Sequence, residues 1–217
     1  MVRYTLLEAA RLADASYDVK NNPLTRNRVR GSCPDDSAQA HMLDNGTLLI
    51  TGSNGFDDYL KFNLQVFSLF GKRYSVTDGP TEAGASRSLW HQGFLAHARI
   101  VFKFAKPFKP KFVIGHSLGG ASAQILGKSF GVPAIGFGSP RTRKKGSGRI
   151  NGENHSLTIS HKDDLVARLP ASFRHLGRNI PVAWATPKTG PKHAMRNYIT
   201  LLEAAQGQSG LPTRWPE

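Results

Sequence analysis

The segment Lys111-Phe112-Val113-Ile114-Gly115-His116-Ser117-Leu118-Gly119-Gly120 decides the fold prediction for this chain. Its apolar first part, residues 111–114, predicts a buried strand, and residues 118–130 predict a helix. A serine on so sharp a strand-to-helix turn takes a strained conformation, and glycines two positions before and after it leave room for the turn. Gly115 and Gly119 occupy those two positions. The segment therefore predicts a nucleophile elbow with Ser117 as the nucleophile.

The rest of the chain alternates between short apolar runs and longer amphipathic ones. We predict further strands at residues 47–51, 134–137 and 157–160, further helices at about 4–17 and 90–104, and a loop at 20–40. Strands that alternate with helices imply parallel βαβ units, so we expect an α/β fold with a mostly parallel central sheet and helices on both faces. Since no linker or repeat interrupts the pattern, we expect one domain over residues 1–217.

The composition is strongly basic. Lys and Arg number 29 against 15 acidic residues, for a formal net charge of +14. Such a surplus favours an anionic partner such as a membrane surface, although a basic surface that only keeps the protein in solution explains it equally well. No Lys/Arg-rich helix carries interleaved aromatic residues and no zinc-ligand spacing occurs, so no nucleic-acid partner is expected. The composition predicts no oligomeric state.

The single cysteine and the first twelve residues indicate the cellular compartment in which the chain is made. Cys33 has no second cysteine to pair with in the chain, so an intrachain disulfide is excluded and a reducing compartment fits. Charged residues interrupt the first twelve positions, and no long uncharged apolar stretch occurs elsewhere. We therefore expect a chain made in the cytoplasm without a signal peptide or transmembrane segment, which either acts at a membrane surface or leaves the cell without a cleaved signal.

A serine nucleophile needs a histidine to take its proton and a carboxylate to orient that histidine. In the α/β-hydrolase fold these partners follow the serine in the order acid, then histidine. Among the later acids only Asp163 and Asp164 come just after a predicted strand, where side chains emerge at the edge of a parallel sheet. The later histidines are His175 and His193. Position in the sequence alone does not decide between the two acids or between the two histidines.

Five motifs of the sequence resemble the class 3 lipase family, the fungal-lipase-like branch of the α/β-hydrolases. They are Gly115-His116-Ser117-Leu118-Gly119-Gly120-Ala121, Gly138-Ser139-Pro140-Arg141, Asp164-Leu165-Val166-Ala167-Arg168-Leu169-Pro170, Phe173-Arg174-His175-Leu176-Gly177 and His91-Gln92-Gly93-Phe94. The resemblance covers most of the chain and implies the α/β-hydrolase fold. It also implies hydrolysis of carboxylic esters, with no metal and no other cofactor.

The resemblance also selects the site residues. In the family the catalytic acid begins the motif that matches Asp164 here, and Ala167 stands where proline is usual. The catalytic histidine of the family lies ahead of a helix that contains a tyrosine, which selects His193 ahead of Tyr198 and gives His175 a structural role. The resemblance further implies an oxyanion hole formed by Leu118 and by Ser53. Thr51, two residues before Ser53, replaces the arginine that is usual in the family.

The substrate is less sharply defined by these motifs. A triacylglycerol lipase, a phospholipase A1 and a feruloyl-type esterase would share all of them, and a catalytically dead lipid- or protein-binding relative is the alternative from another class. Asp58-Tyr59 resembles the pair with which the lid of the family begins, so residues 54–70 are either a lid or part of the core. The basic loop 141–152 follows a predicted strand, which places it on the same sheet edge as Ser117 and favours an anionic lipid surface.

Overall fold

The computed structural model describes residues 2–52, 66–69, 72–75, 79–85, 87–146, 148, 150–183, 193–205 and 210–217. The strands of its main sheet are β2 (Val29–Ser32), β3 (Ala40–Leu43), β4 (Thr47–Ile50), β9 (Phe112–His116), β10 (Ala134–Phe137), β12 (Ser156–His161) and β14 (Arg178–Val182). They lie in the order β14-β12-β10-β9-β4-β3-β2. Neighbours from β14 to β4 run parallel, whereas β3 and β2 are antiparallel to their neighbours. The predicted mostly parallel sheet is confirmed.

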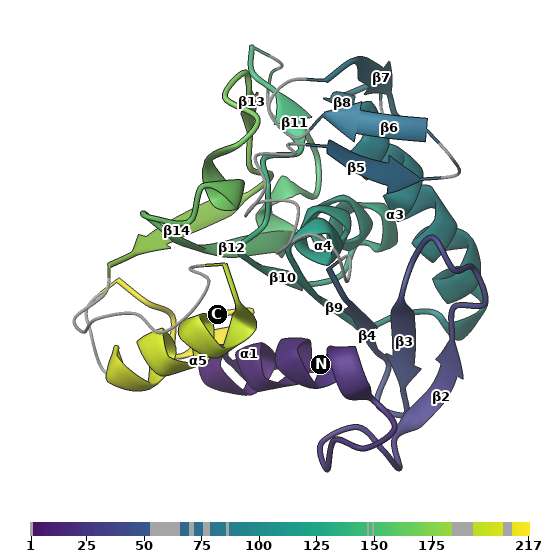
Figure 1. The fold of residues 1–217 in the computed structure, drawn as a ribbon, viewed down its shortest axis with the longest axis vertical. Coiled ribbons are helices and arrows are strands. Elements are labelled where there is room, and N and C mark those ends of the chain that lie inside the picture. The colour runs from purple at the N-terminus through teal and green to yellow at the C-terminus, as the bar shows by residue number, and fades with distance from the viewer. Residues whose placement is uncertain are drawn as a thin grey trace.

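Helices cover both faces of this sheet, as predicted (Figure 1). The helices α3 (Gln92–Ala105) and α4 (Leu118–Phe130) pack on one face, and α1 (Leu6–Ala15) and α5 (Met195–Ala204) pack on the other. Along β9, Val113 joins the core under α3 and α4, whereas Phe112 and Ile114 join the core under α1 and α5. A central strand that is buried on both faces has no polar side, which explains its unbroken apolar run.

Shorter strands build a second layer of structure beside the main sheet. An antiparallel sheet lies above α4 in Figure 1, and its strands are, in spatial order, β13 (Phe173–Arg174), β11 (Arg143–Lys144), β8 (Leu89–His91) and β7 (Thr81–Ala83). The remaining elements among the described residues are β1 (Tyr4–Thr5), η1 (Ser16–Asp18), β5 (Val66–Leu69), β6 (Lys72–Ser75), η2 (Lys106–Phe108), η3 (Glu153–His155), η4 (Val166–Arg168) and β15 (Arg214–Trp215). The strand β1 pairs with β15, and β5 pairs with β6.

The prediction of a loop over residues 20–40 is wrong in one part, because Val29–Ser32 forms β2 at the edge of the main sheet. An edge strand bonds to one neighbour and is half exposed, so it needs no apolar run to mark it. Within the predicted lid region, Val66–Leu69 forms β5, whereas residues 53–65 and 70, with Asp58-Tyr59 among them, lie outside the described residues. Of the described helices, none is long and apolar enough to cross a membrane.

Candidate active site

Ser117 lies on the sharp turn between β9 and α4, with φ 56° and ψ −124°. A residue other than glycine rarely takes a positive φ, and such strain persists only where the surroundings impose it. Here the Ser117 N–H donates to Phe137 O at 3.0 Å, and a side chain at Gly115 or Gly119 would overlap the backbone opposite. The Ser117 hydroxyl is buried and makes no hydrogen bond to a described residue. The turn therefore has the geometry of a nucleophile elbow.

The first turn of α4 and the end of β4 lie beside this serine. Leu118 begins α4, so its N–H is among the first four of the helix, which have no acceptor within it and sit at the positive end of the helix dipole. A Cβ atom at Gly52 would lie 2.9 Å from Ser117 Cβ, so the chain just after β4 contacts the elbow. Ser53, the other predicted oxyanion donor, is outside the described residues.

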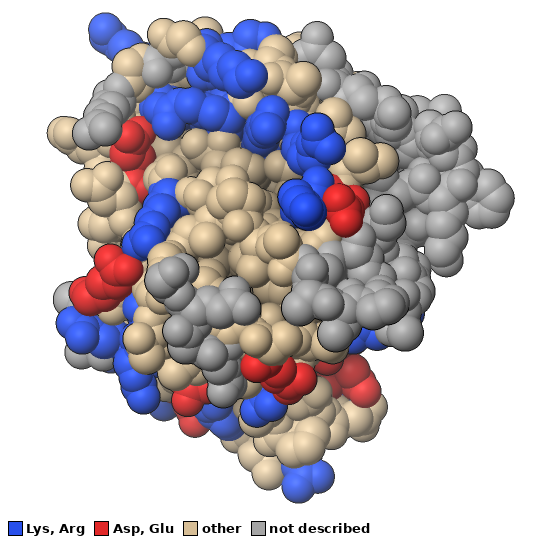
Figure 2. Space-filling model, turned by 90° about the vertical axis from the view of Figure 1, so that its left-hand side faces the viewer, with Lys and Arg blue, Asp and Glu red and all other residues tan. Residues whose placement is uncertain are grey.

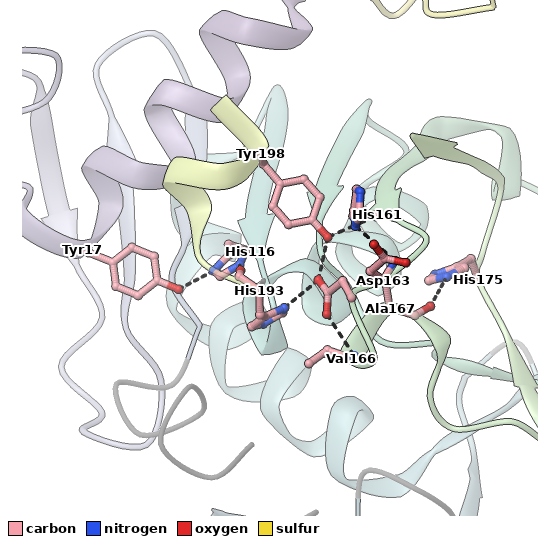
Figure 3. Close-up of polar contacts among 10 residues, drawn as sticks. Tyr17, His116, His161, Asp163, Val166, Ala167, His175, His193 and Tyr198 are labelled. Carbon is pink, nitrogen blue, oxygen red and sulfur yellow. Dashed lines mark hydrogen bonds and ion pairs between the residues drawn. The ribbon is translucent and has the colours of Figure 1, made fainter. Parts of the chain in front are cut away.

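Asp164 lies just beyond the carboxyl end of β12 and is 1 % exposed. Its Oδ2 accepts from His193 Nδ1 at 2.8 Å and from the Tyr198 hydroxyl at 2.6 Å, and its Oδ1 accepts from the Val166 N–H at 3.0 Å (Figure 3). Burial alone raises the pKa of Asp164, but the neighbouring His193 and the hydrogen bonds from His193 and Tyr198 outweigh it, so the pKa lies below its ordinary value. The carboxylate is therefore ionised at neutral pH.

His193 precedes α5 and is brought to Asp164 across 29 residues of chain. Because Asp164 is ionised, the imidazole donates to it from Nδ1, and the neutral ring then has Nε2 as its proton acceptor. The His193 ring also lies 4.7 Å, centroid to centroid, from the ring of His116, the residue before Ser117. The structure thus brings the Asp164–His193 pair against His116, the residue that precedes Ser117.

The two residues that were the rivals of Asp164 and His193 point elsewhere. Asp163 is half-buried, and its N–H donates to His161 Nδ1 at 3.1 Å. His175 bonds through Nε2 to Ala167 O at 3.0 Å, on the side of the 164–169 segment away from His193 (Figure 3).

One link in the site has no counterpart in the sequence analysis. His116 Nε2 lies 2.8 Å from His193 O and must donate to it, since a carbonyl only accepts. Burial lowers the pKa of His116 to about 3, so the ring is neutral and its Nδ1 accepts from the Tyr17 hydroxyl at 2.6 Å. That hydroxyl accepts in turn from the Gly52 N–H at 3.0 Å. Tyr17 and His116 therefore tie the end of β4 to the loop that carries His193.

Comparisons with solved structures identify the fold of the chain. The Rhizomucor miehei lipase in its propeptide complex matches with a TM-score of 0.53 and 18 % identity, over 80 % of this chain and 66 % of that chain. The Lip2 lipase of Yarrowia lipolytica matches with a TM-score of 0.55 and 16 % identity, over 85 % and 81 %. A lipase of Rhizopus microsporus var. chinensis matches with a TM-score of 0.54 and 17 % identity, over 92 % and 85 %. The chain has the fold of the fungal lipases. The predicted α/β-hydrolase fold is thus confirmed.

The fungal-lipase fold also includes a triacylglycerol lipase described as having a serine protease triad as its catalytic centre, matched with a TM-score of 0.51 and 16 % identity over 92 % of each chain. At the level of sequence, no protein-family profile matches. A short segment is 62 % identical over 29 residues to a putative lipase, ATG15, of Saccharomyces cerevisiae. That segment spans 13 % of this chain and 6 % of the yeast protein.

Proposed function

We propose that the chain is a serine carboxylic-ester hydrolase that acts on lipid esters, as a triacylglycerol lipase or a phospholipase A1-like enzyme. One observation carries the proposal: a buried Asp164–His193 pair lies against His116, the residue before the strained Ser117, at the carboxyl edge of the sheet. Support for a lipid ester comes from the proteins that share the fold, which are described as lipases. The yeast protein with the short matching segment is described as a putative lipase.

The proposed reaction uses the chain's own residues throughout. Ser117 Oγ attacks the ester carbonyl carbon while its proton passes to His193 Nε2, and the imidazolium is stabilised by the Asp164 carboxylate. The negative charge that develops on the carbonyl oxygen is stabilised by the N–H of Leu118 and, as the second donor, of Ser53. His193 then protonates the leaving alcohol. Water activated by the same imidazole hydrolyses the acyl-enzyme, which restores the Ser117 hydroxyl.

The finer proposal on partners is that the enzyme works at an anionic lipid surface. A net charge of +14 supports it, since each basic side chain near an anionic membrane contributes about 1 kcal/mol of attraction. That attraction is screened over about 8 to 10 Å at physiological salt. Binding to anionic vesicles should therefore weaken steeply as salt rises, whereas hydrolysis of a short soluble ester should barely change. Equal binding to neutral and anionic vesicles would contradict the surface role.

Replacement of the nucleophile tests the activity itself. Ser117→Ala should lower kcat for p-nitrophenyl and phospholipid esters by about 10⁴-fold or more and abolish labelling by a fluorophosphonate. Ser129→Ala is the matched control, because Ser129 lies near the other end of α4, where its hydroxyl bonds to Ile125 O. Turnover that survives in the Ser117 variant would refute the mechanism. Hydrolysis of short esters only would favour a small-molecule esterase, and no hydrolysis by the wild-type chain would favour a dead binding relative.

A further inference from the structure

The positive charge of the chain is concentrated in one stretch of sequence, and the fold divides that stretch between two edges of the main sheet. Residues 83–152 contain twelve Lys and Arg but no Asp or Glu, so they carry twelve of the fourteen surplus charges. The segment 141–145 follows the carboxyl end of β10, on the edge where Ser117 lies. Figure 2 shows Lys and Arg side chains gathered high on the left-hand face of the molecule, whereas lower on that face they are mixed with Asp and Glu.

A second group of cations lies at the opposite, amino edge of the sheet, between α3 and β9. We call this surface the amino-edge turn, and its cations are Lys103, Lys106, Lys109 and Lys111. The Lys111 N–H donates to Gly46 O at 2.8 Å, which places the turn beside the start of β4. All four lysines are exposed, and none forms an ion pair with a described residue. The acid of the neighbouring β3–β4 turn, Asp44, pairs instead with Arg28 at 3.2 Å.

The backbone of the amino-edge turn is held in place and presents an aromatic ring among the lysines. Pro107 and Pro110 each fix one backbone dihedral of the turn. The Phe108 ring packs over β2, since a Cβ atom at Gly31 would lie 2.7 Å from Phe108 Cζ, and it lies 5.4 Å from the Phe104 ring, centroid to centroid. Phe108 is nevertheless 39 % exposed. A partner therefore meets four cations and an aromatic edge that need little ordering on binding.

The amino-edge turn acts independently of the basic loop on the other edge. The strand β9 (Phe112–His116) separates Lys111 from Ser117, and at about 3.3 Å per residue their backbones lie about 20 Å apart. Charges are screened over about 8 Å at physiological salt, so the turn attracts anions by itself. The lower end of α3, from which the turn continues, lies on the side of β2 in Figure 1. A flat surface in contact with the turn therefore faces away from Ser117.

We propose that the amino-edge turn docks on an anionic lipid bilayer and holds the chain there with its Ser117 edge turned away from that bilayer. The four ammonium groups lie among the lipid phosphates, and each raises binding by about fivefold. The exposed edge of Phe108 enters the boundary between headgroups and acyl chains. An acidic polymer would match the charges only, whereas a bilayer also takes up the aromatic edge. The docking goes beyond ester hydrolysis and does not depend on it.

Matched charge variants test whether this turn binds the bilayer. In the Ser117→Ala chain, Lys106→Gln combined with Lys111→Gln should lower binding to phosphatidylcholine vesicles that contain phosphatidylglycerol by about tenfold or more in sedimentation. Lys72→Gln combined with Arg87→Gln removes the same charge from exposed residues of β6 and of the turn before β8, and should lower binding less than about threefold. Equal loss in the two variants would show general charge attraction and overturn the proposal.

Two tryptophan substitutions test which edge faces the bilayer. Phe108→Trp lies in the amino-edge turn, whereas Leu165→Trp lies on the Ser117 edge, where Leu165 follows Asp164 and is 63 % exposed. Lipids brominated on the acyl chains quench a tryptophan that reaches them. We expect the fluorescence that Phe108→Trp adds to the parent chain to be quenched on vesicles with phosphatidylglycerol. Quenching at position 165 without quenching at position 108 would overturn the proposal.

Removal of the aromatic ring tests the nature of the partner. Phe108→Ser should weaken vesicle binding by about threefold to thirtyfold, the order expected for the exposed part of the ring, and leave binding to poly-L-glutamate unchanged. Vesicle binding that is unchanged in Phe108→Ser would identify an acidic polymer as the better partner and overturn the bilayer assignment. Equal binding to vesicles with and without phosphatidylglycerol would also overturn it.

The docking and the proposed ester hydrolysis can fail separately. With Ser117 present, the lysine and Phe108 variants should hydrolyse soluble esters at the wild-type rate. A chain that hydrolyses esters but does not bind vesicles through the amino-edge turn would refute the docking alone. A chain that binds vesicles through this turn but hydrolyses no ester would support the docking and refute the proposed function alone.

Discussion

Replacement of each of two adjacent acids by its amide distinguishes the catalytic carboxylate from its neighbour. Asp164 Oδ2 accepts from both His193 and Tyr198, and Oδ1 accepts from the Val166 N–H. In Asp164→Asn one of these oxygens becomes an NH₂ group. If the NH₂ faced Val166, two donors would meet, so it faces His193 and Tyr198 instead.

That orientation places the wrong tautomer in the site. An amide N–H that donates to His193 Nδ1 leaves the ring proton on Nε2, which then cannot take the proton of Ser117. We expect kcat to fall by about 10⁴-fold, which corresponds to about 5.4 kcal/mol of transition-state stabilisation. Loss of the charge-assisted bonds should also lower the free energy of unfolding by about 1 to 3 kcal/mol.

The neighbouring acid serves as the control. Asp163 is half-buried, and its N–H bonds to His161 Nδ1, so Asp163→Asn should keep kcat within about threefold and stability within about 1 kcal/mol of the wild type. Rates of p-nitrophenyl ester hydrolysis and urea unfolding of both variants, measured side by side, separate chemistry from stability. An inactive Asp163 variant beside an active Asp164 variant would refute the reasoning, as would two variants that lose activity equally.

The remaining predictions concern histidines and Tyr17. His193→Ala should abolish activity in a folded protein. His175→Ala should instead lower the free energy of unfolding by about 1 to 3 kcal/mol and leave soluble-ester hydrolysis largely intact. Thermal melts and hydrolysis rates of both variants test this, and the reverse result would contradict the two assignments. Tyr17→Phe removes the hydroxyl between Gly52 and His116, so kcat should fall by about three- to thirtyfold while KM stays unchanged; a change in KM alone would contradict a positioning role. His97, His116 and His175 have pKa values lowered to about 4, 3 and 4, so the unfolded chain binds more protons below pH 6.5. The free energy of unfolding should therefore fall with pH from about 6.5 towards 4, by up to about 1.4 kcal/mol per unit for each histidine, and a flat profile in urea unfolding would show that these rings are not held neutral.

Much of the fold could be predicted from local patterns. The strand, turn and helix around Ser117 follow from an apolar run, two glycines and a helical period, because these features act on the backbone within a few residues. Strands that are buried on both faces have continuous apolar runs, and β4, β9, β10 and β12 were predicted for that reason. The half-exposed edge strand β2 was missed because it has no such signal.

The candidate site required more than local patterns. The sequence alone limited the acid to Asp163 or Asp164 and the histidine to His175 or His193, and the family resemblance selected Asp164 and His193. The structure places those two side chains in contact across 29 residues of chain, and their catalytic roles stay predictions.

Tertiary structure decided the contacts between distant segments. Tyr17 meets His116 across 99 residues, and in the sequence it could not be distinguished from the other apolar positions of its helix. Arg143, one of a run of basic residues, is buried against Glu153 while Arg141 is not. Apolar periodicity and turn residues determine which backbone conformations are favourable within a segment, so they can be recognised along the chain. Which side chains meet depends on how whole helices and strands pack, and residues far apart in the sequence determine that packing together.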